Sequence, residues 1–451
     1  MDVGRHPNIH LLAYAEVEKV EGEVGNFQVT VRQKPRYVDE SKCTGCGTCA
    51  EKCPTVTSDI YNLGLGTAKS IYKYFAQGIP SAYTIDAVQC RNFQPGKKCG
   101  VCQKICQAGA IDYKQEEKIL DVPVGAIIVA TGYDLFDARK IPEYGYGRLP
   151  NVVTALEFER FLSASGPTHG HVYRPTDLAL QASLPEMKKV YQKAEKALER
   201  FEKHFQMTSE SFYLRYESGE LRGKDEDYDK WAEAVQAYRQ GMGELEALQE
   251  RIDRMESAHR LAFIQCVGSR DLRFNKYCSG FCCMHAIKEA TIAKEHDRDA
   301  QVYMLAMDIR AVGKGFEEYR NRGATESGIH YIRSRVAEIS EDRDHTPIIW
   351  YEDTKERVVH HLPVDLVILS TACEPSAAGE RLAELLAIEL NEFGFFKTTP
   401  YPPLDTTRPG VFVCGCAHSP MDIPESVVQA SCAAARAAQV LSGSATRRLA
   451  S

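Results

Sequence analysis

The sequence lacks a long apolar run, an excess of positive charge and a secretory signal. Its longest apolar stretches, 124–130 and 366–369, have the length of strands, whereas a membrane-spanning helix needs about 20 apolar residues. The formal net charge of −7 gives no electrostatic reason to expect nucleic acid or an anionic membrane as a partner. The N-terminal sequence MDVGRHPNIH has no apolar segment after a charged one, as a secretory signal has. These absences predict a cytoplasmic chain without a transmembrane segment.

Cysteine is the residue that the chain has in abundance. Its 451 residues suffice for about two to four domains of about 100–200 residues each, and a composition with 44% hydrophobic and 26% charged residues is that of a folded protein. Stable disulfides are not expected in a cytoplasmic chain, so the sixteen cysteines need another role. Twelve of them fall into three tight groups, and such grouping points first to metal ligation.

The first two groups repeat a pattern that is typical of bacterial ferredoxins. The first group is Cys43, Cys46, Cys49 and Cys53, with Pro54 after its last member. The second group is Cys90, Cys99, Cys102 and Cys106, with a longer first gap and Gln107 after its last member. In such a repeat the fourth cysteine of each run ligates the other run's [4Fe–4S] cluster. The alternatives are zinc knuckles or a disulfide scaffold.

The crossed arrangement predicts the ligands of each cluster. Cluster one takes Cys43, Cys46, Cys49 and Cys106, and cluster two takes Cys53, Cys90, Cys99 and Cys102. Gly45 and Gly47 are small enough to let the backbone approach the sulfides. Two such clusters form an electron-transfer path and not a reaction site.

The third group is Cys266, Cys278, Cys282 and Cys283. Cys266 ends a predicted strand, and the other three lie at the start of a predicted helix, with Cys278 and Cys282 one helical turn apart. A helix N-terminus lowers the pKa of a thiol and favours an anionic cluster. Three interpretations stay open: a third [4Fe–4S] site, a redox dithiol, or buried structural cysteines.

Other polar residues give weaker signals. The remaining cysteines, Cys373, Cys414, Cys416 and Cys432, are expected to be buried and inert. The His169-Gly-His171 sequence is expected at the surface, and His285 is expected to pack on its helix, although it could tune or ligate the third cluster. Arg270, Asp271 and Arg273 are expected to anchor a loop by ion pairs.

Strands that alternate with helices predict an α/β fold. The expected elements are a β-ribbon at 8–32, strands at 124–132, 261–268, 301–307, 365–369 and 411–413, a second ribbon at 330–360, and helices at 284–296, 379–388 and 424–442. Residues 178–258 differ, because apolar residues recur there every three or four positions on both sides of a polar stretch. This pattern predicts an antiparallel helical hairpin that either packs on itself or serves as an arm for a partner protein.

Several segments together resemble the HdrA family, the iron–sulfur flavoprotein subunits of heterodisulfide reductases. They are the cysteine module, GRHPNIHLLAYAEVEKVEGEVGNF, GAIIVATGYD, FIQCVGSRD, YCSGFCCMHAIKEA, MDIRAVGKGFEEY and SPMDIPESVVQAS. The resemblance covers the chain except the hairpin. It implies FAD in a thioredoxin reductase-like FAD/NAD(P)-binding fold, with clusters that lead to and from the flavin and take part in electron bifurcation or confurcation. It also implies that the third cysteine group holds a cluster near the flavin.

The resemblance also implies flavin-side residues, partners and segments. The flavin-side residues are Ala130, Thr131, Gly132, Lys314, Gly415, Asp422, Ile423 and Pro424. The expected partners are other heterodisulfide reductase-like subunits, a hydrogenase- or dehydrogenase-linked electron-input subunit, and ferredoxin. The segments are a partial FAD-binding domain at 1–35, the two-cluster module at 36–115, a continued FAD-binding domain at 116–177, the hairpin at 178–258, a second dinucleotide-binding-like domain with the third cluster at 259–400, and a C-terminal FAD-binding segment at 401–451.

One departure from the family is the missing G-x-G-x-x-G motif, which binds the FAD pyrophosphate at a helix N-terminus. We expect either that Met1 is an internal methionine of a longer protein, with an upstream selenocysteine codon read as stop, or that another chain supplies the motif. Two further functions stay open. One is a flavin-free electron-transfer scaffold. The other is an NAD(P)H-dependent flavoprotein oxidoreductase, which the sequence QCVGSR disfavours because it lacks the glycine pattern.

Overall fold

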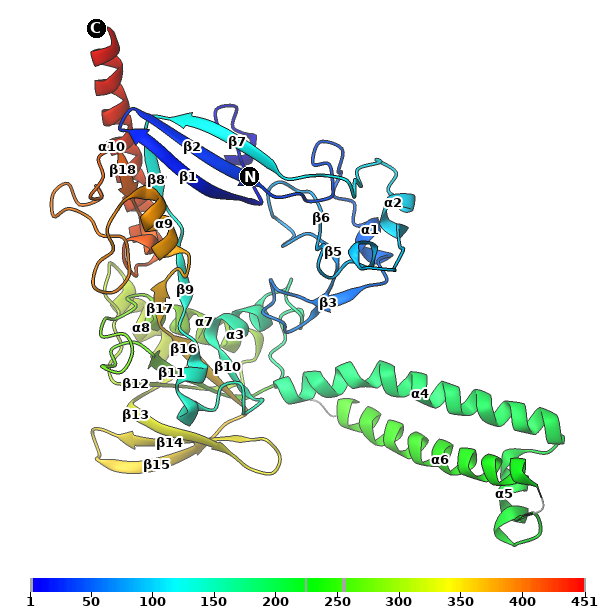
Figure 1. Ribbon diagram of the computed structural model, residues 1–451. Coiled ribbons are helices and arrows are strands. Elements are labelled where there is room, and N and C mark those ends of the chain that lie inside the picture. Colours follow the sequence, from blue (N-terminus) through cyan, green and yellow to red (C-terminus); the bar gives the residue numbers. More distant parts are fainter. Residues whose placement is uncertain (1–2, 224, 254–256, 450–451) are drawn as a thin grey trace.

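The computed structural model describes residues 3–223, 225–253 and 257–449, and its largest sheet has seven strands (Figure 1). The strand order is β10–β16–β11–β12–β13–β14–β15, of which the first five are parallel and the last two antiparallel. The strands are β10 (Val152–Thr154), β11 (Arg260–Val267), β12 (Gln301–Ala306), β13 (His330–Glu341), β14 (Pro347–Asp353), β15 (Val358–Pro363) and β16 (Leu366–Thr371).

The central strands bury both of their faces, which explains their nearly continuous apolar sequences. Leu261 and Phe263 of β11 belong to a core with residues of the helices α3 (Ala155–Leu162) and α7 (Cys282–His296). Ala262 and Ile264 belong to the core on the opposite face. The helix α8 (Phe316–Thr325) adds Tyr319 to the first of these cores. The sheet is therefore a rigid support for the loops at its strand ends.

An antiparallel ribbon holds the cysteine module. It consists of β1 (Ala15–Glu23), β2 (Asn26–Gln33) and β7 (Lys118–Val124). Gln33 pairs with Lys118, so the intervening segment leaves and re-enters the fold at one point. That segment contains β3 (Val56–Ser58), β4 (Thr67–Lys69), β5 (Ile71–Tyr72), β6 (Thr84–Ile85), α1 (Thr48–Glu51) and α2 (Val101–Ile105).

Two further strand pairs join segments that are far apart in the sequence. The strand β8 (Ile127–Val129) pairs in parallel with β18 (Val411–Val413), and β9 (Tyr133–Leu135) pairs antiparallel with β17 (Cys373–Pro375). The helices α9 (Gly379–Leu386) and α10 (Ile423–Leu449) complete this region. The C-terminal segment therefore lies beside the segment that follows the cysteine module.

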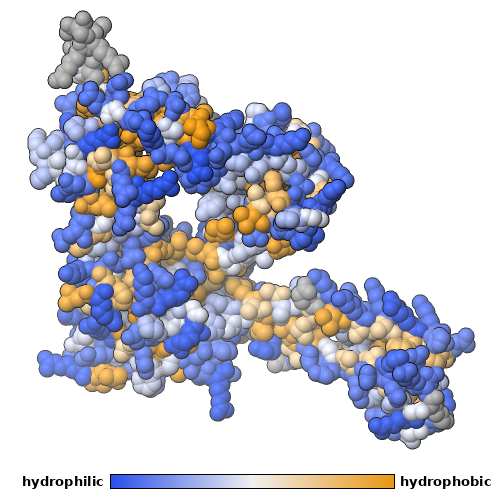
Figure 2. Space-filling model, viewed as in Figure 1, coloured by the Kyte–Doolittle hydropathy of each residue, from blue (hydrophilic) through white to orange (hydrophobic). Residues whose placement is uncertain are grey.

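A helical hairpin extends away from the rest of the chain (Figure 1). Its long helices are α4 (Pro175–Phe205) and α6 (Glu226–Asp253), and α5 (Ser209–Glu217) lies at its far end. The far end has its own core, in which Phe212 stacks on Trp231 with ring centroids 3.9 Å apart. The surface around this end is largely hydrophilic (Figure 2).

The α/β architecture and the helical hairpin agree with the sequence-based prediction. Three details of that prediction are wrong, and the strand β10 and the helices α3 and α8 were not predicted. The ribbon begins at Ala15 and not at residue 8, because residues 9–14 have no strand partner. The hairpin contains α5, which was not predicted, and Cys278 lies before α7 and not on its first turn. Among the described residues, no helix is both long enough and apolar enough to cross a membrane.

The core at the far end of the hairpin predicts a local effect on stability. Phe212 is fully buried against Trp231, so Phe212→Ala should lower the free energy of unfolding of the hairpin by about 3–5 kcal/mol. Urea unfolding followed by Trp231 fluorescence measures this loss. Leu214→Ala, on the same helix but 64% exposed, should change it by less than about 0.5 kcal/mol. Equal effects of the two substitutions would contradict the assignment of this core.

Candidate functional site

The two halves of the cysteine module have the same local geometry. A glycine with positive φ precedes each short helix: Gly47 with φ 90° before α1, and Gly100 with φ 111° before α2. Each glycine stands between two cysteines of its group, and an L side chain is disfavoured at these φ values. The turn at each glycine therefore lies between two cysteines of one group. Neighbouring cysteines need such a turn if both are to ligate the same cluster.

Four cysteines from both halves line one small cavity. They are Cys53 from the first group and Cys90, Cys99 and Cys102 from the second. The Tyr113 hydroxyl lies 2.9 Å from the Cys102 sulfur, and the Ser70 hydroxyl lies 3.4 Å from the Cys53 sulfur. The structure thus brings together the four residues that the crossed arrangement assigns to cluster two.

The remaining cysteines of the module lie around the same core. Cys43 and Cys46 are near Cys49, whose pKa is raised to about 11, mainly by burial. Cys106 ends α2 and accepts a hydrogen bond from the Ala110 amide at 3.4 Å. A buried thiol gives up its proton only where a positive charge compensates the thiolate. An iron–sulfur cluster supplies that charge, so the cysteine thiols of the module fit such a cluster.

The third cysteine group is assembled from β11, a loop and α7. Cys266 follows Gln265 in an extended strand but has φ 62°, a conformation that turns its side chain out of the strand pattern. Cys282 and Cys283 are buried at the start of α7, where their thiols are hydrogen-bonded to each other. Cys278 accepts a hydrogen bond from the Gly280 amide at 3.4 Å. The Cys283 and Cys278 thiols lie close enough to raise the pKa of Cys266, and the Cys283, Cys266 and Cys278 thiols lie close enough to raise the pKa of Cys282.

An arginine holds the loop beside this group. Arg270 makes a bidentate ion pair with Asp308, at 2.6 and 3.0 Å, and its Nη1 lies 3.9 Å from the Cys266 sulfur. Arg273 pairs with Asp271 at 2.9 Å. The predicted anchoring of this loop by ion pairs is confirmed. Burial raises the pKa of Cys266 to about 11, so this thiol too needs a nearby cation to ionise.

A large cavity of about 890 Å³ opens at the carboxyl ends of β8 and β18. Its lining is mainly apolar, and the volume lies within the range of about 300–1,000 Å³ that is usual for ligand and cofactor sites. Gly132 and Gly415 follow the two strands with φ 72° and 66°. A Cβ at Gly132 would meet nothing within 4 Å, so the backbone here borders open space.

Six of the eight predicted flavin-side residues line this cavity. They are Ala130, Gly132, Gly415, Asp422, Ile423 and Pro424. Thr131 and Lys314 are not among its lining residues. Asp422 caps α10 by accepting a hydrogen bond from the Glu425 amide at 2.8 Å, so the positive end of a long helix dipole lies at the cavity. An apolar cavity with a helix N-terminus at one end fits a flavin with an anionic tail.

One member of the third cysteine group, Cys282, lines the same cavity. Phe281 and Cys282, at the start of α7, line it, and the Phe281 ring lies 5.6 Å from the ring of Tyr133. Tyr133 follows Gly132 on the opposite wall. A cluster held by this group would therefore lie directly beside a cofactor in the cavity.

Two cysteines that were expected to be inert contact each other. Cys373 on β17 is fully buried, and Cys416, which lines the cavity, comes from the loop after β18. A hydrogen bond from the Cys373 thiol lowers the pKa of Cys416 to about 6 and raises that of Cys373. Sequence reasoning missed this pair because the two residues meet only through the tertiary structure. Cys416 is therefore expected to be reactive, whereas Cys414 is buried and Cys432 is exposed on α10.

The cluster motif defines the class of the protein. Residues 36–57 match the family described as the 4Fe-4S binding domain. This match spans all four cysteines of the first group. The chain is thus an iron–sulfur protein of the ferredoxin type in this region.

Comparison with curated proteins extends the likeness to nearly the whole chain. The CoB–CoM heterodisulfide reductase iron-sulfur subunit (HdrA) of Methanocaldococcus jannaschii is 39% identical, over 96% of this chain and 54% of that protein. The corresponding subunit of the H(2):CoB-CoM heterodisulfide,ferredoxin reductase of Methanothermobacter thermautotrophicus is 37% identical, over 97% of this chain and 54% of that protein. The resemblance is confirmed: the chain is homologous to the HdrA subunits of heterodisulfide reductases and spans about half the length of these relatives.

Solved structures give weaker similarities. The thioredoxin reductase of Lactococcus lactis is 15% identical, with a TM-score of 0.35 over 79% of this chain and 85% of that one. The thioredoxin reductase of T. acidophilum is 17% identical, with a TM-score of 0.28 over 42% of this chain and 53% of that one. Both scores are low, and the α/β architecture is defined by the sheet topology of this chain itself.

The Cys373–Cys416 contact predicts how alkylation depends on pH. The thiolate is the reactive form, so the rate of iodoacetamide modification of Cys416 should rise through pH 6 and level off above about pH 7. Mass spectrometry of the peptide that contains Cys416 measures this rate. Cys373→Ala removes the hydrogen-bond donor and should move the midpoint up toward about 8.5, the value of a free thiol. Cys432→Ala should leave the midpoint unchanged. A wild-type midpoint near that of a free thiol would contradict the geometry.

Proposed function

We propose that this chain is an electron-transfer subunit of a heterodisulfide reductase-like complex, in which FAD takes part in electron bifurcation or confurcation. The main support is that Cys282, one member of the third cysteine group, lines the large cavity at the ends of β8 and β18. A metal cluster and a flavin at these positions could exchange electrons directly. The homology to the HdrA subunits of heterodisulfide reductases supports the same function.

The cysteines of the chain hold the clusters in this proposal. Cluster one takes Cys43, Cys46, Cys49 and Cys106, cluster two takes Cys53, Cys90, Cys99 and Cys102, and cluster three takes Cys266, Cys278, Cys282 and Cys283. The shared small cavity of the second set supports the crossed assignment. The Arg270 guanidinium beside Cys266 offers a positive charge to the third, partly buried set.

The cavity residues bind and orient the flavin in this proposal. The glycine turns at Gly132 and Gly415 allow close approach of the backbone, and the N-terminus of α10 favours an anionic group. The apolar walls keep water from the bound ring. When bound, FAD supplies a centre that takes up an electron pair and passes electrons singly.

The partners follow from the same proposal. We infer that other heterodisulfide reductase-like subunits, an electron-input subunit linked to a hydrogenase or a dehydrogenase, and ferredoxin exchange electrons with this chain. The names of two relatives include hydrogen or ferredoxin together with heterodisulfide, which supports this set of partners. The hairpin, which projects from the body, offers an arm for a neighbouring subunit (Figure 1).

Iron content tests the cluster assignment. The purified full chain, loaded with clusters under anaerobic conditions, should contain about twelve irons, because each of three [4Fe–4S] clusters holds four. Cys283→Ala should reduce this to about eight. Cys432→Ala, an exposed cysteine outside the three groups, should leave the iron content unchanged. About eight irons in the unaltered chain would remove the third cluster and leave the first two.

Flavin release tests the second cofactor. Denaturation of the native complex should release about one flavin per chain, measured by its fluorescence. A complex with full iron but no released flavin would favour the flavin-free scaffold. Bleaching of the bound flavin by NADPH in the absence of other subunits would instead favour the NAD(P)H-dependent oxidoreductase.

A further inference from the structure

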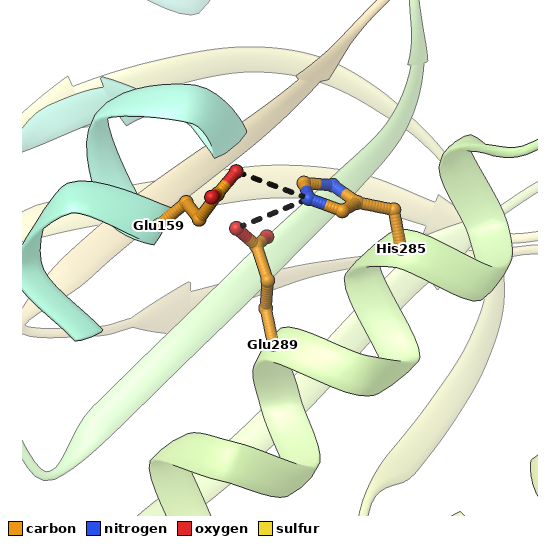
Figure 3. Close-up of side chains that lie close together, drawn as sticks. All are labelled: Glu159, His285 and Glu289. Atoms are coloured by element: carbon orange, nitrogen blue, oxygen red, sulfur yellow. Dashed lines mark ion pairs between the residues drawn. The ribbon is translucent and has the colours of Figure 1, made fainter. Parts of the chain in front are cut away.

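Three side chains from two helices converge beside the large cavity. Glu159 comes from α3, and His285 and Glu289 come from successive turns of α7 (Figure 3). The His285 Nε2 lies 3.7 Å from a Glu159 oxygen and 3.6 Å from a Glu289 oxygen. One ligand atom from each of the three lies within 4.8 Å of the other two. Glu159 and His285 also line the cavity.

Glu289 is the unusual member of this cluster. Its side chain is only 3% exposed, and neither carboxylate oxygen has a hydrogen-bond partner. An isolated buried carboxylate is costly, because burial removes its hydration without replacing it. Figure 3 shows this carboxylate directed toward His285 and Glu159. A cation between the three side chains would give these buried oxygens a partner.

The distances from the His285 nitrogen to the two carboxylates fit ligation of a shared metal ion better than direct hydrogen bonds. Hydrogen bonds between nitrogen and oxygen are about 2.7–3.2 Å long, shorter than both distances from His285. With metal–ligand bonds of about 2.1 Å, tetrahedral ligands lie about 3.4 Å apart. The two distances from His285 exceed this separation by only about 0.2–0.3 Å. The two carboxylates lie within 4.8 Å of each other, so one ion can lie between all three ligands.

We propose that Glu159, His285 and Glu289 bind a divalent first-row transition metal ion. One nitrogen and two carboxylates are the donor set of Mn²⁺, Fe²⁺ or Zn²⁺, and they leave a coordination position that faces the cavity. The ion ties α3 to α7 next to Cys282 and Cys283. The site uses no cysteine, so it is separate from the cluster sites and does not depend on the proposed electron transfer.

Mn²⁺ binding tests the proposal in the full chain loaded with its iron–sulfur clusters. Mn²⁺ prefers oxygen and nitrogen donors, so it does not compete for the cysteine groups. Loss of the EPR signal of hydrated Mn²⁺ reports binding. The unaltered chain should bind about one Mn²⁺, and Glu289→Gln should weaken binding by at least about tenfold, because it removes a charged ligand. Glu295→Gln, an exposed position on the same helix, should bind like the unaltered chain.

Folding is checked by iron content and circular dichroism for each variant. Should Glu289→Gln fail to fold, Glu159→Gln at the more exposed position serves in its place, with the same expected loss. The proposal is overturned if the unaltered chain shows no saturable Mn²⁺ binding, or if the folded variants bind as tightly as the unaltered chain. Either result leaves the iron and flavin measurements unaffected, so the two proposals fail independently.

Discussion

The burial of cysteine sulfur is the physical constraint on which the functional parts of this structure depend. Burial raises the pKa values of Cys49 and Cys266 to about 11, so these side chains are neutral thiols in the bare protein. Cluster ligation needs thiolates, and a buried thiolate is stable only next to a cation. In the ferredoxin-type module an iron–sulfur cluster supplies this cation. For Cys266 the third cluster that we propose would do the same. The glycine turns before α1 and α2 and the strained φ of Cys266 fix the thiol positions in advance.

The second constraint is the pairing of strands that are distant in the sequence. The module closes on itself because Gln33 and Lys118 pair at the edge of the ribbon, so its insertion leaves the ribbon intact. The strands β8 and β18 are far apart in the sequence, yet their parallel pairing brings both glycine turns to one cavity. Parallel strands place their carboxyl ends at the same edge, and loops at that edge commonly form binding sites. Cys282 of the third cysteine group and the N-terminus of α10 border this same cavity.

The local parts of the candidate site could be predicted from the sequence. Cysteine spacing is a short-range signal, and the four residues assigned to cluster two do line one cavity. Alternating and helical periodicity located the hairpin and the strands of the large sheet except β10. Element boundaries were less accurate: the ribbon starts later than predicted, and α5 was not foreseen because its short apolar face packs only in the hairpin core. The contact between Cys373 and Cys416 has no sequence signal, since it joins β17 to the loop after β18, and these segments are distant in the chain.

The sequence by itself determined which chemistry the chain can perform: spacing alone identified the ferredoxin-type groups, and the similarity of ordered segments identified the relatives. Only the tertiary structure decided which of these side chains lie close together in one site. It placed the third cysteine group beside the cavity, gave Cys416 its hydrogen-bond donor, and put Glu159 against two residues of α7. The physical reason is that ligation and electron transfer need contact in space, and contacts between distant segments arise only when the sheet and its helices pack.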